Sequence, residues 1–138
     1  MPSDVDYFIR FAGHNPKTDP GMGLYQNCYG QFDIDVVGKD VVSIDRRFLH
    51  PLQRRYQMKS GYDEDFVICP TLQSIMTGNV PLAFRVNHSQ FKPTHRLIWV
   101  SNQLDYPDSH YVLQGIEPIS SKTEITFDYN YGKVVCKL

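Results

Sequence analysis

The sequence EITFDY, residues 124–129, contains one of the short apolar runs that decide the fold of this 138-residue chain. Its first four residues, Glu124–Phe127, combine β-branched and aromatic side chains, which favour strands. Six similar runs precede it, bounded by glycine, proline, asparagine or aspartate, which are typical of turns. The predicted strands are Tyr7–Phe11, Phe32–Val37, Val41–Ile44, Phe66–Ile68, Leu97–Ser101, Tyr111–Gly115 and Glu124–Phe127. Seven short strands indicate a mainly β fold of several small sheets with few short helices.

Two segments between the strands are candidates for short helices. One is Thr71–Met76, which Gly78-Asn79 would end. The other is Leu52–Lys59, which follows Pro51. This second segment belongs to a long connection, Asp45–Asp65, and connections of that length in small domains usually have a function or move.

Length and composition predict a single domain spanning residues 1–138. A mass of 16.0 kDa suits one core, and 41% hydrophobic with 21% charged residues excludes a disordered linker. No apolar run approaches the roughly 18 residues of a membrane span, and the acidic start, Met1–Asp4, is unlike a secretory signal. We therefore expect a soluble, intracellular protein that is not associated with a membrane. The three cysteines, Cys28, Cys69 and Cys136, lie too far apart for a disulfide scaffold or a four-cysteine zinc site.

The charge of the chain is unevenly distributed. The segment 46–59 holds five basic residues and no acidic one, which leaves nine basic against fifteen acidic residues elsewhere. The basic segment is either a solvated face or a docking patch for an acidic partner or for nucleic-acid phosphate. The acidity of the remainder makes nucleic acid an unlikely main ligand, because binding to a phosphate backbone needs a basic field over the whole footprint.

Three motifs stand in a fixed order along the chain. The first is GMGLY, residues 21–25, which alone indicates only a turn and lacks the third glycine and following helix of a dinucleotide site. The second is Gly78-Asn79 followed by FRVNHS, residues 84–89, with Pro93 beyond it. The third is EITFDY, which precedes Asn-Tyr-Gly at 130–132.

In this order and spacing, the motifs resemble the SET domain of protein lysine methyltransferases over residues 21–136. The resemblance implies small twisted sheets and a threaded, knot-like crossing that brings Asn87–Ser89 next to Asp128-Tyr129. It also implies a transferase that uses S-adenosylmethionine to methylate a lysine in a protein, such as a histone tail. We would then expect a chromatin regulator, nuclear in a eukaryote.

The resemblance also implies roles for individual residues. Methyl transfer to an amine is an in-line displacement, so donor and lysine must enter from opposite sides of a narrow channel. Tyr129 would be the catalytic residue, accepting weak C–H···O contacts from the methyl group, and Phe127 would leave room for more than one methyl. Asn87 would offer its amide donors, and the main chain of His88 would pair with the adenine edge. The implied site is cofactor-binding Gly21, Met22, Gly23, Asn87 and His88, catalytic Tyr129, and substrate-channel Phe127 and Tyr131.

Some positions depart from the family pattern. Gln90 replaces the usual cysteine after Asn-His-Ser, so we expect no zinc, and Thr94 replaces an asparagine. The lysine channel would be closed by the tail Tyr131–Leu138, by a partner chain, including a second copy in a homodimer, or by the peptide substrate. An upstream tyrosine of the family is replaced by Val36-Val37-Gly38, and Tyr25 or Tyr29 could substitute for it.

Other interpretations remain open at this point. The chain could be an inactive SET-like interaction module, or a nucleic-acid contact protein that uses the basic segment. Tyr129 could be an ordinary core tyrosine and His88 an ordinary buried histidine. A metal site using His88 and His95 lacks a third ligand at a convincing spacing.

Overall fold

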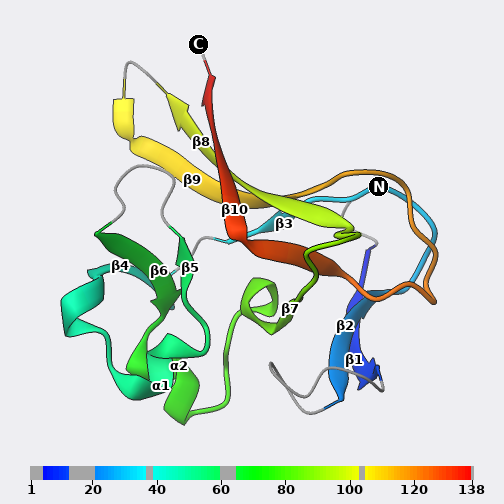
Figure 1. Ribbon diagram of the computed structural model, residues 1–138, viewed down its shortest axis with the longest axis horizontal. Helices are drawn as coiled ribbons and strands as arrows, with labels where there is room; N and C mark the ends of the chain where they lie inside the picture. Colours follow the sequence, from blue (N-terminus) through cyan, green and yellow to red (C-terminus); the bar gives the residue numbers. More distant parts are fainter. Residues whose placement is uncertain (1–4, 13–20, 37–38, 60–64, 103–104, 138) are drawn as a thin grey trace.

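The computed structural model describes the backbone of residues 5–12, 21–36, 39–59, 65–102 and 105–137, and their side chains except at 59, 99–110 and 130–137. Three sheets account for its strands (Figure 1). The first pairs β1 (Tyr7–Phe11) with β2 (Met22–Gln26), and the third has the order β4 (Val41–Asp45), β6 (Phe66–Pro70), β5 (Met58–Lys59). Between them lies the largest sheet, ordered β3 (Ile34–Asp35), β9 (Asp105–Gly115), β8 (His95–Asn102), β10 (Thr126–Lys137), β7 (Asn87–His88). The expected mainly β fold of several small sheets is confirmed.

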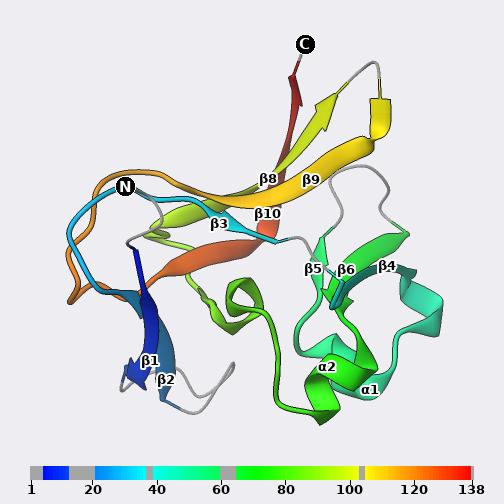
Figure 2. The ribbon, with the colours of Figure 1, turned by 180° about the vertical axis from the view of Figure 1, so that it is seen from behind.

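The two outer sheets lie on opposite sides of the central one, as Figures 1 and 2 both show. One cluster of buried apolar side chains joins all three sheets. It includes Leu24 of β2, Leu113 of β9 and Ile68 of β6, each at most 2% exposed. Because burial of such side chains is the main stabilising contribution to folding, this shared core holds the sheets together. None of the helices within the described ranges has the length and apolar character that a bilayer crossing requires.

The predicted helix at Thr71–Met76 is present as α2 (Leu72–Met76). The Thr71 hydroxyl accepts the amide of Ser74 at 3.1 Å and caps its start. Gly78, at φ 78°, ends it in the left-handed conformation that glycine tolerates best.

The prediction of helix over Leu52–Lys59 was only partly right. α1 covers Pro51–Arg54 and is capped by His50, whose Nδ1 accepts the amide of Leu52 at 3.1 Å. Beyond it the chain becomes strand β5, because Met58 pairs with Ile68 and is buried in the core. Two short 3-10 helices, Arg46–Phe48 and Leu82–Arg85, complete the described elements.

Several strand boundaries differ from those expected. Strands β2, β5 and β7 were not predicted, and the predicted strand Phe32–Val37 is reduced to β3, with Val37 outside the described residues. The largest difference is β10, which continues to Lys137 instead of ending at Phe127. Its far half pairs in parallel with β8, from Gly132 opposite Leu97 to Lys137 opposite Asn102. The C-terminal segment is thus part of the central sheet.

Candidate functional site

The two motifs expected to converge meet where β7 and β10 run side by side. Asn87 lies opposite Thr126, and His88 lies opposite Phe127. The backbone amide of Tyr129 donates to Nδ1 of His88 at 3.0 Å, and the two rings are 4.9 Å apart. His88 and Tyr129 are 41 residues apart in the sequence, yet β7 and the start of β10 form one structural unit.

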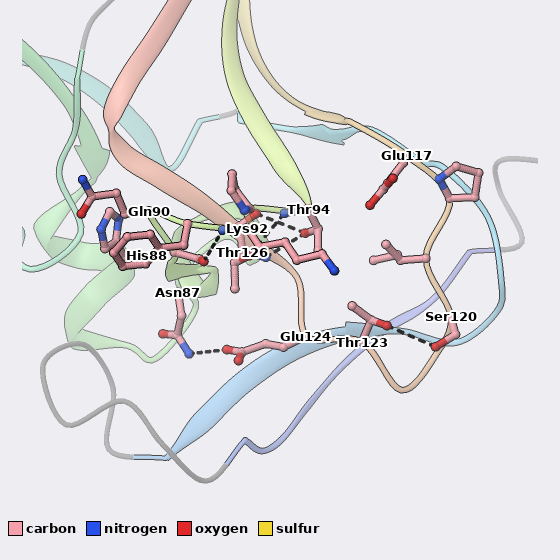
Figure 3. Close-up of a pocket in the computed structure, with 15 residues that line it drawn as sticks. Asn87, His88, Gln90, Lys92, Thr94, Glu117, Ser120, Thr123, Glu124 and Thr126 are labelled. Atoms are coloured by element: carbon pink, nitrogen blue, oxygen red, sulfur yellow. Dashed lines mark hydrogen bonds between the residues drawn. The ribbon is translucent and has the colours of Figure 1, made fainter.

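Two cavities flank this pair of strands. The larger, of about 860 Å³, is named here the Asn87 cavity (Figure 3). It is lined by Asn87, His88, Ser89, Gln90, Phe91, Lys92, Pro93, Thr94, Glu117, Pro118, Ile119, Ser120, Thr123, Glu124 and Thr126. The smaller, of about 10 Å³, is named the Tyr129 pocket. It is lined by Arg55, Tyr56, Gln57, Met58, Phe84, Val86, Phe127 and Tyr129.

Neighbouring residues of these segments line different cavities, as expected where strand side chains alternate between faces. Thr126 lines the Asn87 cavity, and its neighbour Phe127 lines the Tyr129 pocket. In the same way Asn87 and the preceding Val86 line different cavities. No described residue lines both, so Asn87 and Tyr129 are close together without sharing one space.

Asn87 is held by two internal hydrogen bonds. Its Nδ2 donates to the carbonyl oxygen of Met22 at 2.7 Å and to Oε2 of Glu124 at 2.6 Å. Both partners are acceptors, so the amide orientation follows from the network. Both amide hydrogens are therefore used within the protein, so the predicted donation from Asn87 to a ligand would require one of these two hydrogen bonds to break. The other polar atom of the side chain, Oδ1, could still accept a hydrogen bond from a ligand.

The glycines of the first motif allow close approach by side chains of the protein itself. A Cβ on Gly23 would lie 2.5 Å from Oε2 of Glu124. Gly21 has a φ of 77°, and a Cβ atom there would collide with the ring of Phe11. The lining of the Asn87 cavity does not include Gly21, Met22 or Gly23. This segment contacts two lining residues instead, because Met22 accepts a hydrogen bond from Asn87 and Gly23 lies against Glu124. Glu124 is thus a site residue that the sequence analysis did not assign, although it begins the EITFDY motif.

His88 presents its backbone to the outside of the sheet. The amide of Ser89 donates to the carbonyl of Phe127 at 3.1 Å. Because backbone groups of successive strand residues point to opposite sides, the N–H and C=O of His88 point away from β10. β7 is the last strand of the described sheet, and His88 is among the residues that line the Asn87 cavity. Its backbone N–H and C=O are a donor and an acceptor suited to the edge of a flat polar heterocycle.

The imidazole of His88 has a defined role in this arrangement. Its Nδ1 accepts a hydrogen bond from Tyr129, so in the neutral ring Nε2 carries the proton. Oδ1 of Asp128 lies 3.9 Å from the same Nδ1. That contact is an ion pair only when the ring is protonated, which would remove the hydrogen bond to Tyr129.

The Tyr129 pocket combines aromatic walls with one fixed phenol. The hydroxyl of Tyr129 donates to the carbonyl of Val86 at 2.6 Å, and its ring lies 4.8 Å from that of Phe127. A volume of about 10 Å³ holds little more than one water molecule. A lysine side chain could enter only after some of the residues that line the pocket had moved.

Of the expected tyrosines whose side chains the structure describes, Tyr129 lines one of these two cavities, and Tyr25 and Tyr29 line neither. Tyr25 is buried and stacked on Phe8, and Tyr29 is 73% exposed on the surface. The side chain of Tyr131 lies outside the described residues, as does Gly38 of the valine-rich segment. Tyr56 is a second tyrosine that lines the Tyr129 pocket. No motif marks it, because its position depends on the packing of β5 near β10.

His95 and Thr94 form a buried polar group at the start of β8. The Nε2 of His95 donates to the carbonyl of Phe32 at 3.0 Å, and its Nδ1 lies 2.8 Å from the Thr94 hydroxyl. Burial lowers the pKa of His95 below its ordinary value. Both ring nitrogens of His95 are engaged in these contacts. Within the described residues, no group of three histidine, cysteine or acidic side chains could hold a metal ion.

Comparison with known proteins adds no relative. Neither the models of known protein families nor the curated protein sequences contain a match to this chain. The function must therefore be inferred from the motifs and from the site.

Proposed function

We propose that this chain is a SET-type methyltransferase that transfers a methyl group from S-adenosylmethionine to a lysine of a protein. The observation that carries the proposal is that neighbouring residues of β10, Thr126 and Phe127, line the Asn87 cavity and the Tyr129 pocket respectively. An in-line displacement needs donor and acceptor to approach from opposite sides, and separate cavities beside one strand support such an arrangement.

The Asn87 cavity suits a cofactor of this size and chemistry. Its volume of about 860 Å³ falls in the range of small-molecule sites. The carboxylates of Glu117 and Glu124 are acceptors for hydroxyl groups, and Lys92 supplies a cation for a carboxylate. The backbone of His88 would pair with a heterocycle edge. When bound, S-adenosylmethionine supplies an electrophilic methyl group.

On the other side, the Tyr129 pocket would orient and desolvate the lysine. A free lysine has a pKa of about 10.4 and must lose its proton before it attacks. Aromatic walls disfavour the ammonium form and lower that pKa. Tyr129 keeps acceptor capacity after it donates to Val86, so its oxygen can receive weak C–H···O contacts from a polarised methyl.

The decisive test is methyl transfer by a Tyr129→Phe variant. Radiolabelled S-adenosylmethionine would be incubated with the chain and with mixed histones and other proteins, and cofactor affinity would be measured in parallel by calorimetry. We expect at least a hundredfold loss of transfer, equivalent to about 2.7 kcal/mol, with cofactor binding retained. Tyr29→Phe, a change at an exposed tyrosine outside both cavities, is the matched control. Full transfer by Tyr129→Phe would refute the catalytic role.

One observation favours a second candidate, an inactive SET-like interaction module. The Tyr129 pocket is closed to about 10 Å³, and no described residue connects it to the Asn87 cavity. Cofactor binding without transfer to any protein of a cell lysate would support this candidate. Absence of cofactor binding as well would contradict the proposed methyltransferase.

A further inference from the structure

The basic segment of the sequence leads directly to the Tyr129 pocket. Arg54 ends α1, Arg55 follows as its C-cap, and the next three residues, 56–58, line the pocket. Arg55 lines the pocket as well, with its guanidinium carbon 5.5 Å from the centre of the Tyr56 ring. The positive charge of this segment therefore stands at the rim where a substrate lysine would enter.

Among the residues that the structure describes, Arg54 and Arg55 have no ion-pair partner. Arg47, in the neighbouring 3-10 helix, is paired with Asp45 at 2.9 Å. Arg54 and Arg55 are both exposed. The other described residues that line the pocket are uncharged, so Arg55 is the charged residue of this lining.

A guanidinium at the rim opposes one kind of substrate and favours another. The basic neighbours of a lysine in a histone-like tail would be repelled by Arg55. A carboxylate next to the lysine would instead form a charge-assisted, bidentate pair with it. The same guanidinium disfavours the ammonium form of an incoming lysine, which assists its deprotonation.

We propose that Arg55 selects protein segments in which the target lysine has an aspartate or glutamate within two residues. This inference rests on the proposed methyltransferase function and narrows its substrate class from basic tails to acidic segments. A peptide is favoured over nucleic acid because Arg55 shares its pocket with Tyr129 and Phe127, and because the basic residues are concentrated in one segment of an otherwise acidic chain.

The first experiment compares three synthetic peptides with one central lysine, flanked by glutamate, alanine or arginine. We expect kcat/KM for methylation to fall at least tenfold from the glutamate to the arginine peptide. Arg55→Glu should reverse this order, and Arg55→Lys should retain it in weaker form. Arg96→Glu, at an exposed arginine of β8 that lines neither cavity, is the matched control. An unchanged order in Arg55→Glu would overturn the inference.

A second readout separates this inference from the proposed function. Fluorescence anisotropy would measure binding of the labelled glutamate peptide to the intact chain without S-adenosylmethionine. Peptide binding that Arg55→Glu abolishes supports the docking of acidic segments at Arg55 even if no methyl transfer occurs. Methyl transfer that is indifferent to flanking charge would instead uphold the enzyme and overturn the role of Arg55. Tighter, Arg55-dependent binding to duplex DNA than to the peptide would also overturn it.

Discussion

Asn87 joins three parts of the chain through a single side chain. It lies in β7, donates to the backbone of Met22 in β2, and donates to Glu124 just before β10. The carboxylate of Glu124 in turn rests against Gly23, where there is no room for a Cβ atom. Asn87, Glu124 and Gly23 are thus one interlocked unit, and each residue limits what the other two positions accept.

We predict that Gly23→Ala destabilises the protein through Glu124. The new methyl group would lie 2.5 Å from Oε2 of a side chain that Asn87 holds in place, at a cost of about 1–3 kcal/mol. Urea unfolding of Gly23→Ala, Glu124→Ala and the double variant would form a double-mutant cycle. The double variant should lose less stability than the sum of the single changes. If the stability losses of the two single variants simply add in the double variant, the contact between residue 23 and Glu124 is contradicted.

At the scale of elements, the central feature is that β10 lies between two strands that both run parallel to it. Phe127 is opposite His88 of β7 on one side and His95 of β8 on the other. The six residues Ser89–Thr94 therefore carry the chain from one side of β10 to the other. Parallel connections usually need a dozen residues or more, so this crossing is unusually short. It also forms one wall of the Asn87 cavity.

The buried polar group at the start of β8 secures this crossing. The Thr94 hydroxyl accepts the amide of Thr126 in β10 at 2.9 Å and lies 2.8 Å from Nδ1 of His95. In the neutral histidine, Nε2 donates to Phe32, so Nδ1 is the acceptor of the pair. Protonation of His95 would place a charge in this buried group and require the Thr94 hydroxyl to turn.

We predict that stability falls as the pH drops below about 6.5, the ordinary pKa of histidine. The pKa of His95 is lowered by burial, so below that pH the unfolded chain binds more protons than the folded chain. The contribution of neutral His95 is fully present above pH 6.5 and is lost as the pH falls towards the lower, folded pKa. Urea unfolding between pH 5 and 8 would measure it. His95→Asn should flatten this dependence. If the slope of stability against pH is the same in the unmodified protein and in His95→Asn, the dependence comes from other groups.

At the scale of the whole molecule, the three sheets place the two cavities. The central sheet contributes β7 and β10 to the Asn87 cavity and β10 to the Tyr129 pocket, and the segment that leads into β5 of the outer sheet brings Arg55 and Tyr56 to the Tyr129 pocket. Figures 1 and 2 show β5 beside the bend of β10 in both views. The substrate side of the proposed enzyme is therefore built between two sheets.

We predict that Phe127→Tyr reduces the number of methyl groups added to the substrate lysine. Phe127 is 2% exposed and packs against Tyr129, so a hydroxyl there would narrow the pocket and hold a water. Mass spectrometry of the methylated peptide should show a shift from di- and trimethyl towards monomethyl products. Phe66→Tyr, in β6 and outside both cavities, should leave the products unchanged. Trimethylated product alone from Phe127→Tyr would refute the prediction.

The sequence by itself determined the mainly β character, the helix after Thr71 and its end at Gly78. These features depend on side-chain and backbone preferences that act between near neighbours. The same reasoning stopped β10 at Phe127 because Asn130 and Gly132 resemble turn residues. The strand continues through a register shift between Phe127 and Gly132, which pairing with β8 stabilises.

Only the tertiary structure decided how the site is assembled. It uses both amide hydrogens of Asn87, sets Glu124 against Gly23, and places Tyr56 and Arg55 beside Tyr129. Each of these contacts joins residues dozens of positions apart, and each depends on how whole sheets pack. Local preferences carry no information about such contacts, because the energy of a contact is gained only when distant segments of the chain meet.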